Sequence, residues 1–257
     1  MDFEQVKNYW EQRAAMDSSA QSTTMDFYLR DIEFRVMKNM IERLKPKNVM
    51  DIGCGDAKTT ARLARTFPHI NFTGGDYAES MVSNARKAFS VNDIDNLEIV
   101  HCDVTKQLPL KNIDLIYTTR CLINLPSWDL QRQALENISE SLSAGGYYIM
   151  IENFIEGQNN FNRVRRDFGL PEIPVRDHNL FFEREVLLDY VAKLFEIVEE
   201  LNISSTYYLV SRVVYSKICQ ENDIEPDYFD SHHKYAARLP FCGEFGPVRM
   251  ICMQRKQ

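Results

Sequence analysis

The chain has 257 residues, and 44% of them are hydrophobic, which is enough for the full core of one domain with insertions. Its formal net charge of −7 argues against a nucleic-acid backbone as the main partner, because phosphate binding relies on clustered Lys and Arg. A small or neutral substrate is therefore expected.

The sequence also lacks features of membrane and secreted proteins. No stretch approaches the roughly 20 apolar residues of a membrane-spanning helix, and the start, Met-Asp-Phe-Glu, has no basic segment followed by an apolar run. The six cysteines have no paired or metal-type spacing, so we expect reduced thiols. These features predict a cytoplasmic protein with no membrane partner; they give no indication of its oligomeric state.

Strands and helices are expected to alternate along the chain. Helical spacing of apolar residues between Tyr28 and Leu44 predicts a helix that ends before Pro46, which cannot continue it. The following strands are expected at 48–52, 71–75, 97–101, 114–118 and 147–153, and the helices at 58–66, 80–90 and 128–142. Such alternation is typical of a mostly parallel, doubly wound sheet.

A Gly-x-Gly turn, Gly53-Cys54-Gly55, follows the first expected strand. Glycine is needed where the main chain turns tightly and touches a ligand, so a nucleotide-like ligand is predicted here. A dinucleotide would favour a third glycine at position 58, which is Lys58. Asp51 lies two residues before the turn. Its carboxylate does not stabilise an anionic pyrophosphate, but it attracts an ammonium group. S-adenosylmethionine carries an ammonium and a sulfonium group and fits this turn better than NAD.

Five segments, in order, resemble the class I S-adenosylmethionine-dependent methyltransferases. They are Val49–Ala57, Phe72–Met81, Leu97–Val104, Ile113–Tyr117 and Leu142–Met150, and the likeness covers about residues 45–155. The resemblance implies a Rossmann-like α/β fold with a seven-stranded, mostly parallel sheet. Its sixth strand is expected near 195–201, and an antiparallel last strand near 248–253.

The resemblance also implies roles for residues at the strand ends. Asp76 is expected to hold the ribose hydroxyls, and its distance of about 25 residues from Asp51 suits a neighbouring strand end. Asp103 is expected to approach the adenine amino group. The expected cofactor residues in these segments are Asp51, Gly53, Cys54, Gly55, Asp76, Tyr77, Met81, Asp103 and Val104.

Two further cofactor contacts are expected outside these segments. In similar methyltransferases an N-terminal segment folds over the cofactor, which implicates Trp10 and Arg13. Arg13 is suited to bidentate pairing with the methionine carboxylate of the cofactor. Arg120, just after the fourth strand, is a second candidate for this contact. The alternative for the first segment is a solvated amphipathic helix, and Arg120 has a similar structural alternative.

Two stretches exceed what the sheet needs, residues 154–186 and 202–247. Both connect strand ends near which open α/β sheets bind ligands, so we expect helical insertions that form a substrate lid. Residues 1–44 are expected to be N-terminal helices that partly cover the cofactor, within a single domain spanning 1–257. Parts of the insertions resemble methyltransferases found with bacterial surface-polysaccharide biosynthesis.

Methyl transfer is an in-line displacement that depends on positioning and a dry site. A hydroxyl or ammonium acceptor also needs a base, and the candidates are Glu152, at the end of the fifth strand, and His178 and His232 in the insertions. The alternative for Glu152 is that its carboxylate only orients the following loop. The alternative for the histidines is that they are structural imidazoles without a catalytic role. His232-His233 does not predict a metal site, because adjacent side chains diverge.

The residues after the fourth strand lack the Asn/Asp-Pro-Pro-aromatic cluster of amino-methylating nucleic-acid enzymes, and Cys121 is interpreted as a packed thiol. The sequence therefore predicts methylation of oxygen, or less readily nitrogen, in a small polar metabolite. A sugar or nucleotide-sugar for a surface polysaccharide is the more specific hypothesis. The alternatives are methylation of a lipid, quinone or natural-product scaffold, and a non-catalytic S-adenosylmethionine-binding protein.

Overall fold

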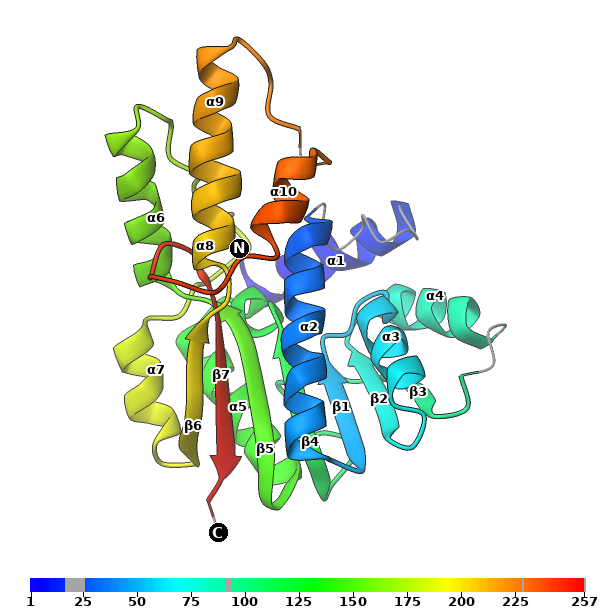
Figure 1. The fold of residues 1–257 in the computed structure, drawn as a ribbon. Coiled ribbons are helices and arrows are strands. Elements are labelled where there is room, and N and C mark those ends of the chain that lie inside the picture. The colour runs from blue at the N-terminus through cyan, green and yellow to red at the C-terminus, as the bar shows by residue number, and fades with distance from the viewer. Residues whose placement is uncertain (17–25, 91–93, 228, 257) are drawn as a thin grey trace.

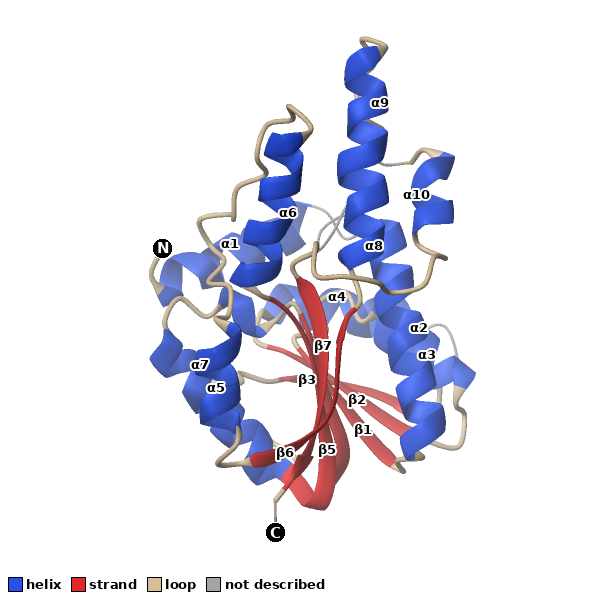
Figure 2. Ribbon diagram, turned by 60° about the vertical axis from the view of Figure 1, so that its left-hand side comes forward, coloured by secondary structure: helices blue, strands red, loops and turns tan. Residues whose placement is uncertain are grey.

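A twisted seven-stranded sheet with the order β3-β2-β1-β4-β5-β7-β6 forms the centre of the molecule. The structure, a computed structural model, describes residues 1–16, 26–90, 94–227 and 229–256. Figures 1 and 2 show helices on both faces of the sheet and a further group of helices beyond one end of the strands. The strands are β1 (Asn48–Ile52), β2 (Asn71–Asp76), β3 (Leu97–His101), β4 (Ile113–Thr119), β5 (Leu142–Asn153), β6 (Phe195–Asn202) and β7 (Val248–Arg255).

The predicted seven-stranded, mostly parallel fold is confirmed. Strand β7 runs antiparallel to both of its neighbours, as the resemblance implied. The main difference is β5, which begins at Leu142 rather than Tyr147. Leu142 pairs with Ile113, and the pairing shifts before Tyr147 meets Leu115. Gly145, with φ of +73°, lies at this shift in pairing. Gly145 and Gly146, which precede the expected strand 147–153, therefore belong to a bulge inside β5.

Helices cover both faces of the sheet and divide the core into two layers. Helix α2 begins after Asp26, whose side chain accepts the Leu29 N–H, and ends at Lys45 in the left-handed conformation. One core layer lies between α2 and the sheet, and the other contains residues of α5. The flanking helices are α2 (Phe27–Leu44), α3 (Lys58–Thr66), α4 (Glu79–Ser90), α5 (Trp128–Ser141) and α7 (Arg184–Val191). Within the described ranges, no helix has both the length and the apolar character needed to span a bilayer.

A second group of helices lies beyond the carboxyl ends of the parallel strands, at the top of Figure 1. It comprises α1 (Phe3–Met16), α6 (Ile155–Asp167), α8 (Ser205–Tyr208), the π-helix η3 (Leu209–Val214), α9 (Tyr215–Glu221) and α10 (Ser231–Ala236), together with the 3-10 turn η2 (Leu122–Asn124). Helices α8, η3 and α9 continue into one another as a single rod (Figure 2). The two predicted insertions supply α6, α8, η3, α9 and α10, so they are placed where a lid is expected. Their role as a lid stays a prediction.

Candidate cofactor and acceptor site

The glycine turn after β1 is fastened to the end of β2. The N–H groups of Gly53 and Cys54 both donate to the Gly75 carbonyl, at 2.8 and 3.0 Å. The Gly55 N–H donates to Oδ2 of Asp76 at 2.8 Å. Gly53 has φ of +75°, a conformation that favours glycine. The turn is therefore held in one shape by its neighbour strand.

The chain after β4 packs directly on the same turn. A Cβ atom at Gly53 would lie 2.3 Å from the Cys121 sulfur, closer than atoms approach without a bond. Burial raises the pKa of the Cys121 thiol well above its usual value, which keeps the thiol neutral. This geometry agrees with the interpretation of Cys121 as a packed thiol.

Asp76 is oriented by the turn it supports. Its other carboxylate oxygen, Oδ1, accepts the Ala78 N–H at 2.9 Å, and only 7% of the residue is exposed. Burial raises the pKa of Asp76, opposed by these two backbone donors. Each carboxylate oxygen can accept a second hydrogen bond, so the side chain retains capacity for a ribose. Its ribose contact stays a prediction.

Asp51 lies beneath the turn and is 4% exposed. It accepts a hydrogen bond from the Thr60 hydroxyl of α3 and, among the described residues, forms no ion pair. Burial raises the pKa of Asp51 to about 7, against the opposing effect of the Thr60 and Tyr117 hydroxyls. A buried acid without a cation fits a ligand that brings an ammonium group.

The remaining expected residues at the strand ends differ in exposure. Asp103 accepts hydrogen bonds from the N–H and hydroxyl of Thr105, at 3.0 and 2.7 Å, and is partly exposed. Val104 is buried in the core layer on the α5 side. Met81 is buried in a small cluster that also contains Trp10. Asp103 is thus available at the end of β3, whereas Val104 contributes mainly packing.

Helix α1 crosses over the glycine turn. Its Val6 carbonyl accepts the Tyr77 hydroxyl at 3.4 Å, after β2, and its Trp10 indole N–H donates to Asn124 Oδ1 at 3.2 Å, after β4. Because β1 lies between β2 and β4, a helix joined to both loops passes above the end of β1. The Glu11 carboxylate adds an anchor by accepting the first N–H groups of α4, from Glu79 at 2.8 Å and Ser80 at 3.2 Å.

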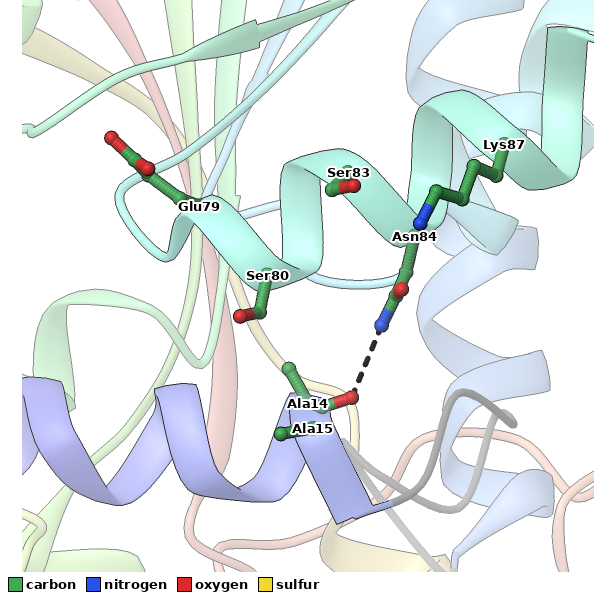
Figure 3. A pocket seen from close by; sticks show the side chains of 7 residues that line it. All are labelled: Ala14, Ala15, Glu79, Ser80, Ser83, Asn84 and Lys87. Carbon is green, nitrogen blue, oxygen red and sulfur yellow. Dashed lines mark hydrogen bonds between the residues drawn. The ribbon is translucent and has the colours of Figure 1, made fainter.

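A hollow of about 490 Å³ lies between the end of α1 and α4 (Figure 3). Its lining is largely polar, and the Asn84 amide crosses it to donate to the Ala14 carbonyl at 3.1 Å. The lining residues are Ala14, Ala15, Glu79, Ser80, Ser83, Asn84 and Lys87. None of the expected cofactor residues belongs to this set, so we do not assign the hollow to the cofactor.

Glu152 lies under the loop that follows β4. The residue is fully buried, and its two oxygens accept the N–H groups of Cys121, Leu122 and Ile123 at 3.0, 2.9 and 3.3 Å. Burial raises the pKa of Glu152 to about 7, while these donors lower it. The geometry favours the alternative in which Glu152 orients the loop, and its direct role as a base stays a prediction.

The candidate histidines lie in different places. His178 stacks on Tyr9 of α1, with ring centroids 4.5 Å apart, and its edge faces Trp10. Burial and the nearby charges of Arg176 and Arg13 lower the pKa of His178. The fold thus brings His178 beside α1, where Arg13 also lies.

His232 lies on α10 instead, exposed and paired with Asp230 at 2.5 Å. No contact within the described ranges joins His232 to the glycine turn or to α1. The neighbouring His233 is buried, and its Nε2 lies 2.8 Å from the Asp227 carbonyl oxygen. The described residues contain no cluster of three or more metal-ligating side chains.

Arg120 forms an ion pair that the sequence did not reveal. Its Nε lies 2.8 Å from Glu33 Oε1, and its Nη2 donates to Oε2 at 3.1 Å. Nearby, Asp26 accepts hydrogen bonds from Arg212 and Tyr207, both at 2.6 Å. The signal for Glu33 was its position four residues after Leu29, on the buried stripe of α2.

Comparison with known proteins agrees with this arrangement. Residues 49–146 match the family model described as "Methyltransferase domain". A malonyl-[acyl-carrier protein] O-methyltransferase from Paenibacillus sp. is 26% identical over 154 residues, covering 55% of this chain and 54% of the relative. A Bacillus cereus protein of the same name is 24% identical over 220 residues, covering 79% and 76%. Trans-aconitate 2-methyltransferase from Escherichia coli is 32% identical over 78 residues, covering 30% and 29%. The chain thus spans about half the length of the first of these relatives and less than a third of the last.

Solved structures share the whole fold. The N-methyltransferase NodS from Bradyrhizobium japonicum, in complex with S-adenosylhomocysteine, has a TM-score of 0.55 at 14% identity and covers 98% of both chains. The [4+2]-cyclase SpnF has a TM-score of 0.57 at 20% identity, covering 87% of this chain and 81% of SpnF. Likeness at this level of identity concerns the fold.

The family match over residues 49–146, the named relatives and the shared fold together support a class I S-adenosylmethionine-dependent methyltransferase whose cofactor is S-adenosylmethionine. The residues present fit this cofactor. Within the described ranges, the buried Asp51 has no cationic partner and lies below a turn whose first glycine admits no side chain, and α1 is bonded to the loops on either side of that turn.

We expect Gly53→Ala to weaken S-adenosylhomocysteine binding strongly, because the new methyl group meets Cys121. Gly169→Ala is the matched control, since Gly169 also has positive φ (+67°) but has no atom within 4 Å of the added Cβ. Both variants carry the backbone cost of about 1–2 kcal/mol, and the collision adds roughly 1–3 kcal/mol to the first. Thermal unfolding and calorimetric titration measure the difference; equal effects would contradict the close contact.

We expect S-adenosylhomocysteine to bind more tightly as the pH rises from about 5.5 to 7.5. In the free protein Asp51, with its pKa near 7, is largely protonated at the lower pH, and an ammonium group requires it ionised. Affinity is therefore lost as the pH falls below this pKa. Asp51→Asn cannot ionise and should show a weaker pH dependence in calorimetric titration. An identical profile in the variant argues against the ammonium contact.

Asp76→Asn should reduce S-adenosylhomocysteine affinity by about 1.5–3 kcal/mol, because it removes a charge-assisted acceptor from the ribose. Calorimetric titration gives the change, and circular dichroism checks that the variant remains folded. Full affinity in a folded variant would sink the ribose assignment.

Proposed function

We propose that this protein transfers the methyl group of S-adenosylmethionine to an oxygen atom of a small polar metabolite. The observation that carries the proposal is the glycine turn flanked by the two loops to which α1 is bonded, a place where a cofactor would lie beside the helices that β5 and β6 lead into. Displacement at a sulfonium carbon depends on alignment and on exclusion of water. A turn fixed from both sides and covered by α1 supplies these conditions.

The protein's own residues would contribute mainly positioning. Bound S-adenosylmethionine supplies an electrophilic methyl group. Glu152 holds the chain from Cys121 to Ile123 in place beside the turn. A hydroxyl acceptor also needs a base, and His178 is the candidate that lies beside α1. The lowered pKa of His178 keeps its ring neutral at pH 7, which suits that role.

Three classes of acceptor molecule come into question, and they are supported to different degrees. A sugar or nucleotide-sugar of a surface polysaccharide is supported by the likeness of the insertions to methyltransferases of that biosynthesis. The names of the relatives, malonyl-[acyl-carrier protein] and trans-aconitate methyltransferases, instead point to acceptors that carry carboxylates. A lipid, quinone or natural-product scaffold is less well supported, because Arg120, Glu33, Asp26 and Arg212 give this edge of the sheet a charged character.

Charge and cysteine content support a proposal on the class of substrate and on where the protein acts. A net charge of −7 supports a small-molecule substrate over nucleic acid, and six free thiols suit the cytoplasm.

A function without methyl transfer is the rival hypothesis. The [4+2]-cyclase SpnF has the same fold at a TM-score of 0.57, so the fold alone does not guarantee the reaction. Such a protein would bind the cofactor and leave its methyl group in place on every acceptor offered.

The first experiment is calorimetric titration with S-adenosylhomocysteine, with NAD as the control ligand. We expect micromolar binding of the first and none of the second, because Lys58 replaces the glycine that a pyrophosphate needs. Incubation with methyl-labelled S-adenosylmethionine and a bacterial metabolite extract then tests transfer. Cofactor binding without any labelled product would favour the non-catalytic alternative.

A further inference from the structure

Arg120 is held along one side of its guanidinium group. Glu33 is 2% exposed, and its Oε1 lies 2.8 Å from Arg120 Nε. Its Oε2 accepts a hydrogen bond from Arg120 Nη2 at 3.1 Å. A guanidinium has five N–H donors in a rigid plane. Nη1 donates no hydrogen bond within the part of the chain that the structure describes, and 24% of the side chain is exposed. The end of the group, formed by Nη1 and the second N–H of Nη2, therefore keeps donors that no described residue uses.

The position of Arg120 places that end beside the cofactor turn. Its neighbour in the chain, Cys121, contacts Gly53, so the Arg120 main chain lies next to the turn. Its side chain reaches α2, where Glu33 lies, and its charge acts on Tyr208, at the end of α8. The guanidinium thus lies between the turn and the helices of the proposed lid.

The main chain of Arg120 is also held in an unfavourable conformation. Its φ is +50°, a region that costs a residue other than glycine about 1–3 kcal/mol. The Arg120 N–H donates to the Ile151 carbonyl at 2.7 Å, and the Asn124 amide donates to the Arg120 carbonyl at 2.9 Å. The surrounding contacts therefore fix both the backbone and the guanidinium in one orientation.

We propose that the end of the Arg120 guanidinium binds a carboxylate of the acceptor, which makes the substrate a carboxylic acid and the product its methyl ester. This inference rests on the proposed function. It assigns Arg120 to the acceptor and leaves Arg13 as the candidate partner of the cofactor's methionine carboxylate.

The charges nearby favour a carboxylate over a phosphate dianion. Among the described residues, Arg120 is paired with Glu33 and Arg212 with Asp26, so the charges known around the site are paired. Two parallel N–H groups of one guanidinium match the planar geometry and single charge of a carboxylate.

The chemistry of a carboxylate acceptor also matches the state of the candidate bases. A carboxylate oxygen attacks the methyl carbon, an O–C bond forms, the C–S bond breaks, and its electron pair stays on sulfur. No proton moves, so no base is needed. Glu152 already accepts three N–H groups, and His232 is paired with Asp230 at the surface. His178, the candidate base for a hydroxyl acceptor, would have no proton to remove from a carboxylate.

Malonate titrated into the protein, with and without S-adenosylhomocysteine, tests the site directly, and malonamide is the neutral counterpart. We expect malonate to bind and malonamide not to bind. Arg120→Gln should weaken malonate binding about tenfold or more and leave S-adenosylhomocysteine affinity unchanged. Arg43→Gln is the matched control, because Arg43 also pairs with a glutamate, Glu199, but at the opposite end of α2.

Arg120→Gln leaves Glu33 buried without a cation, so the double variant Glu33→Gln with Arg120→Gln provides a second test with a neutral pair. Loss of malonate binding in this folded variant supports the inference. Malonate binding that is absent from the natural protein, or equal in the folded Arg120 variants, would overturn it. The malonate titration is also made without cofactor, so it does not depend on S-adenosylhomocysteine binding. A protein that fails to bind S-adenosylhomocysteine would contradict the proposed function, and not the carboxylate site.

The labelled product gives an independent readout. Methyl esters release volatile labelled methanol in alkali, whereas methyl ethers of sugars do not. Volatile label that depends on Arg120 and not on Arg43 supports the inference. Alkali-stable label would overturn it and leave methyl transfer itself established.

Discussion

The contact between the chain after β4 and the glycine turn is the constraint on which the site depends. The carboxylate of Glu152 accepts three successive N–H groups from that chain, and one residue of the same segment, Cys121, fills the space above Gly53. The cofactor turn, the Arg120 guanidinium and the Asn124 partner of α1 are all positioned by this short segment. A buried, loop-orienting carboxylate thus helps to fix both the glycine turn and the loop that carries Arg120.

Much of the fold was predictable from local pattern. Asn48–Ile52 and Leu97–His101 are strands with the predicted bounds, because each is an apolar run ended by a turn or an acid. Helix α2 ends where Pro46 requires it to end. The Asp76 contact with Gly55 also agrees with the expected meeting of neighbouring strand ends. Pattern and resemblance were sufficient for these regular pairings, but they missed the bulge through which Leu142 of β5 pairs with Ile113 of β4.

The prediction was weaker where the partner comes from a distant part of the chain. Arg120 and Glu33 are 87 residues apart, and neither spacing nor composition joins them. His178 and His232 were equivalent candidates from sequence, and only the packing of α1 against the first insertion separates them. Glu152 had two interpretations because strand position alone does not show whether a carboxylate points toward a ligand or toward main-chain donors.

The attachment of α1 has a consequence for turnover. Single hydrogen bonds join α1 to the two strand-end loops, and each hydrogen bond contributes only about 1 kcal/mol of net stability. Detachment of the helix therefore costs a small part of the stability of the whole domain. If the cofactor binds under α1 as proposed, we expect it to be exchanged by a brief opening of this one helix, while the sheet and the loop after β4 remain intact.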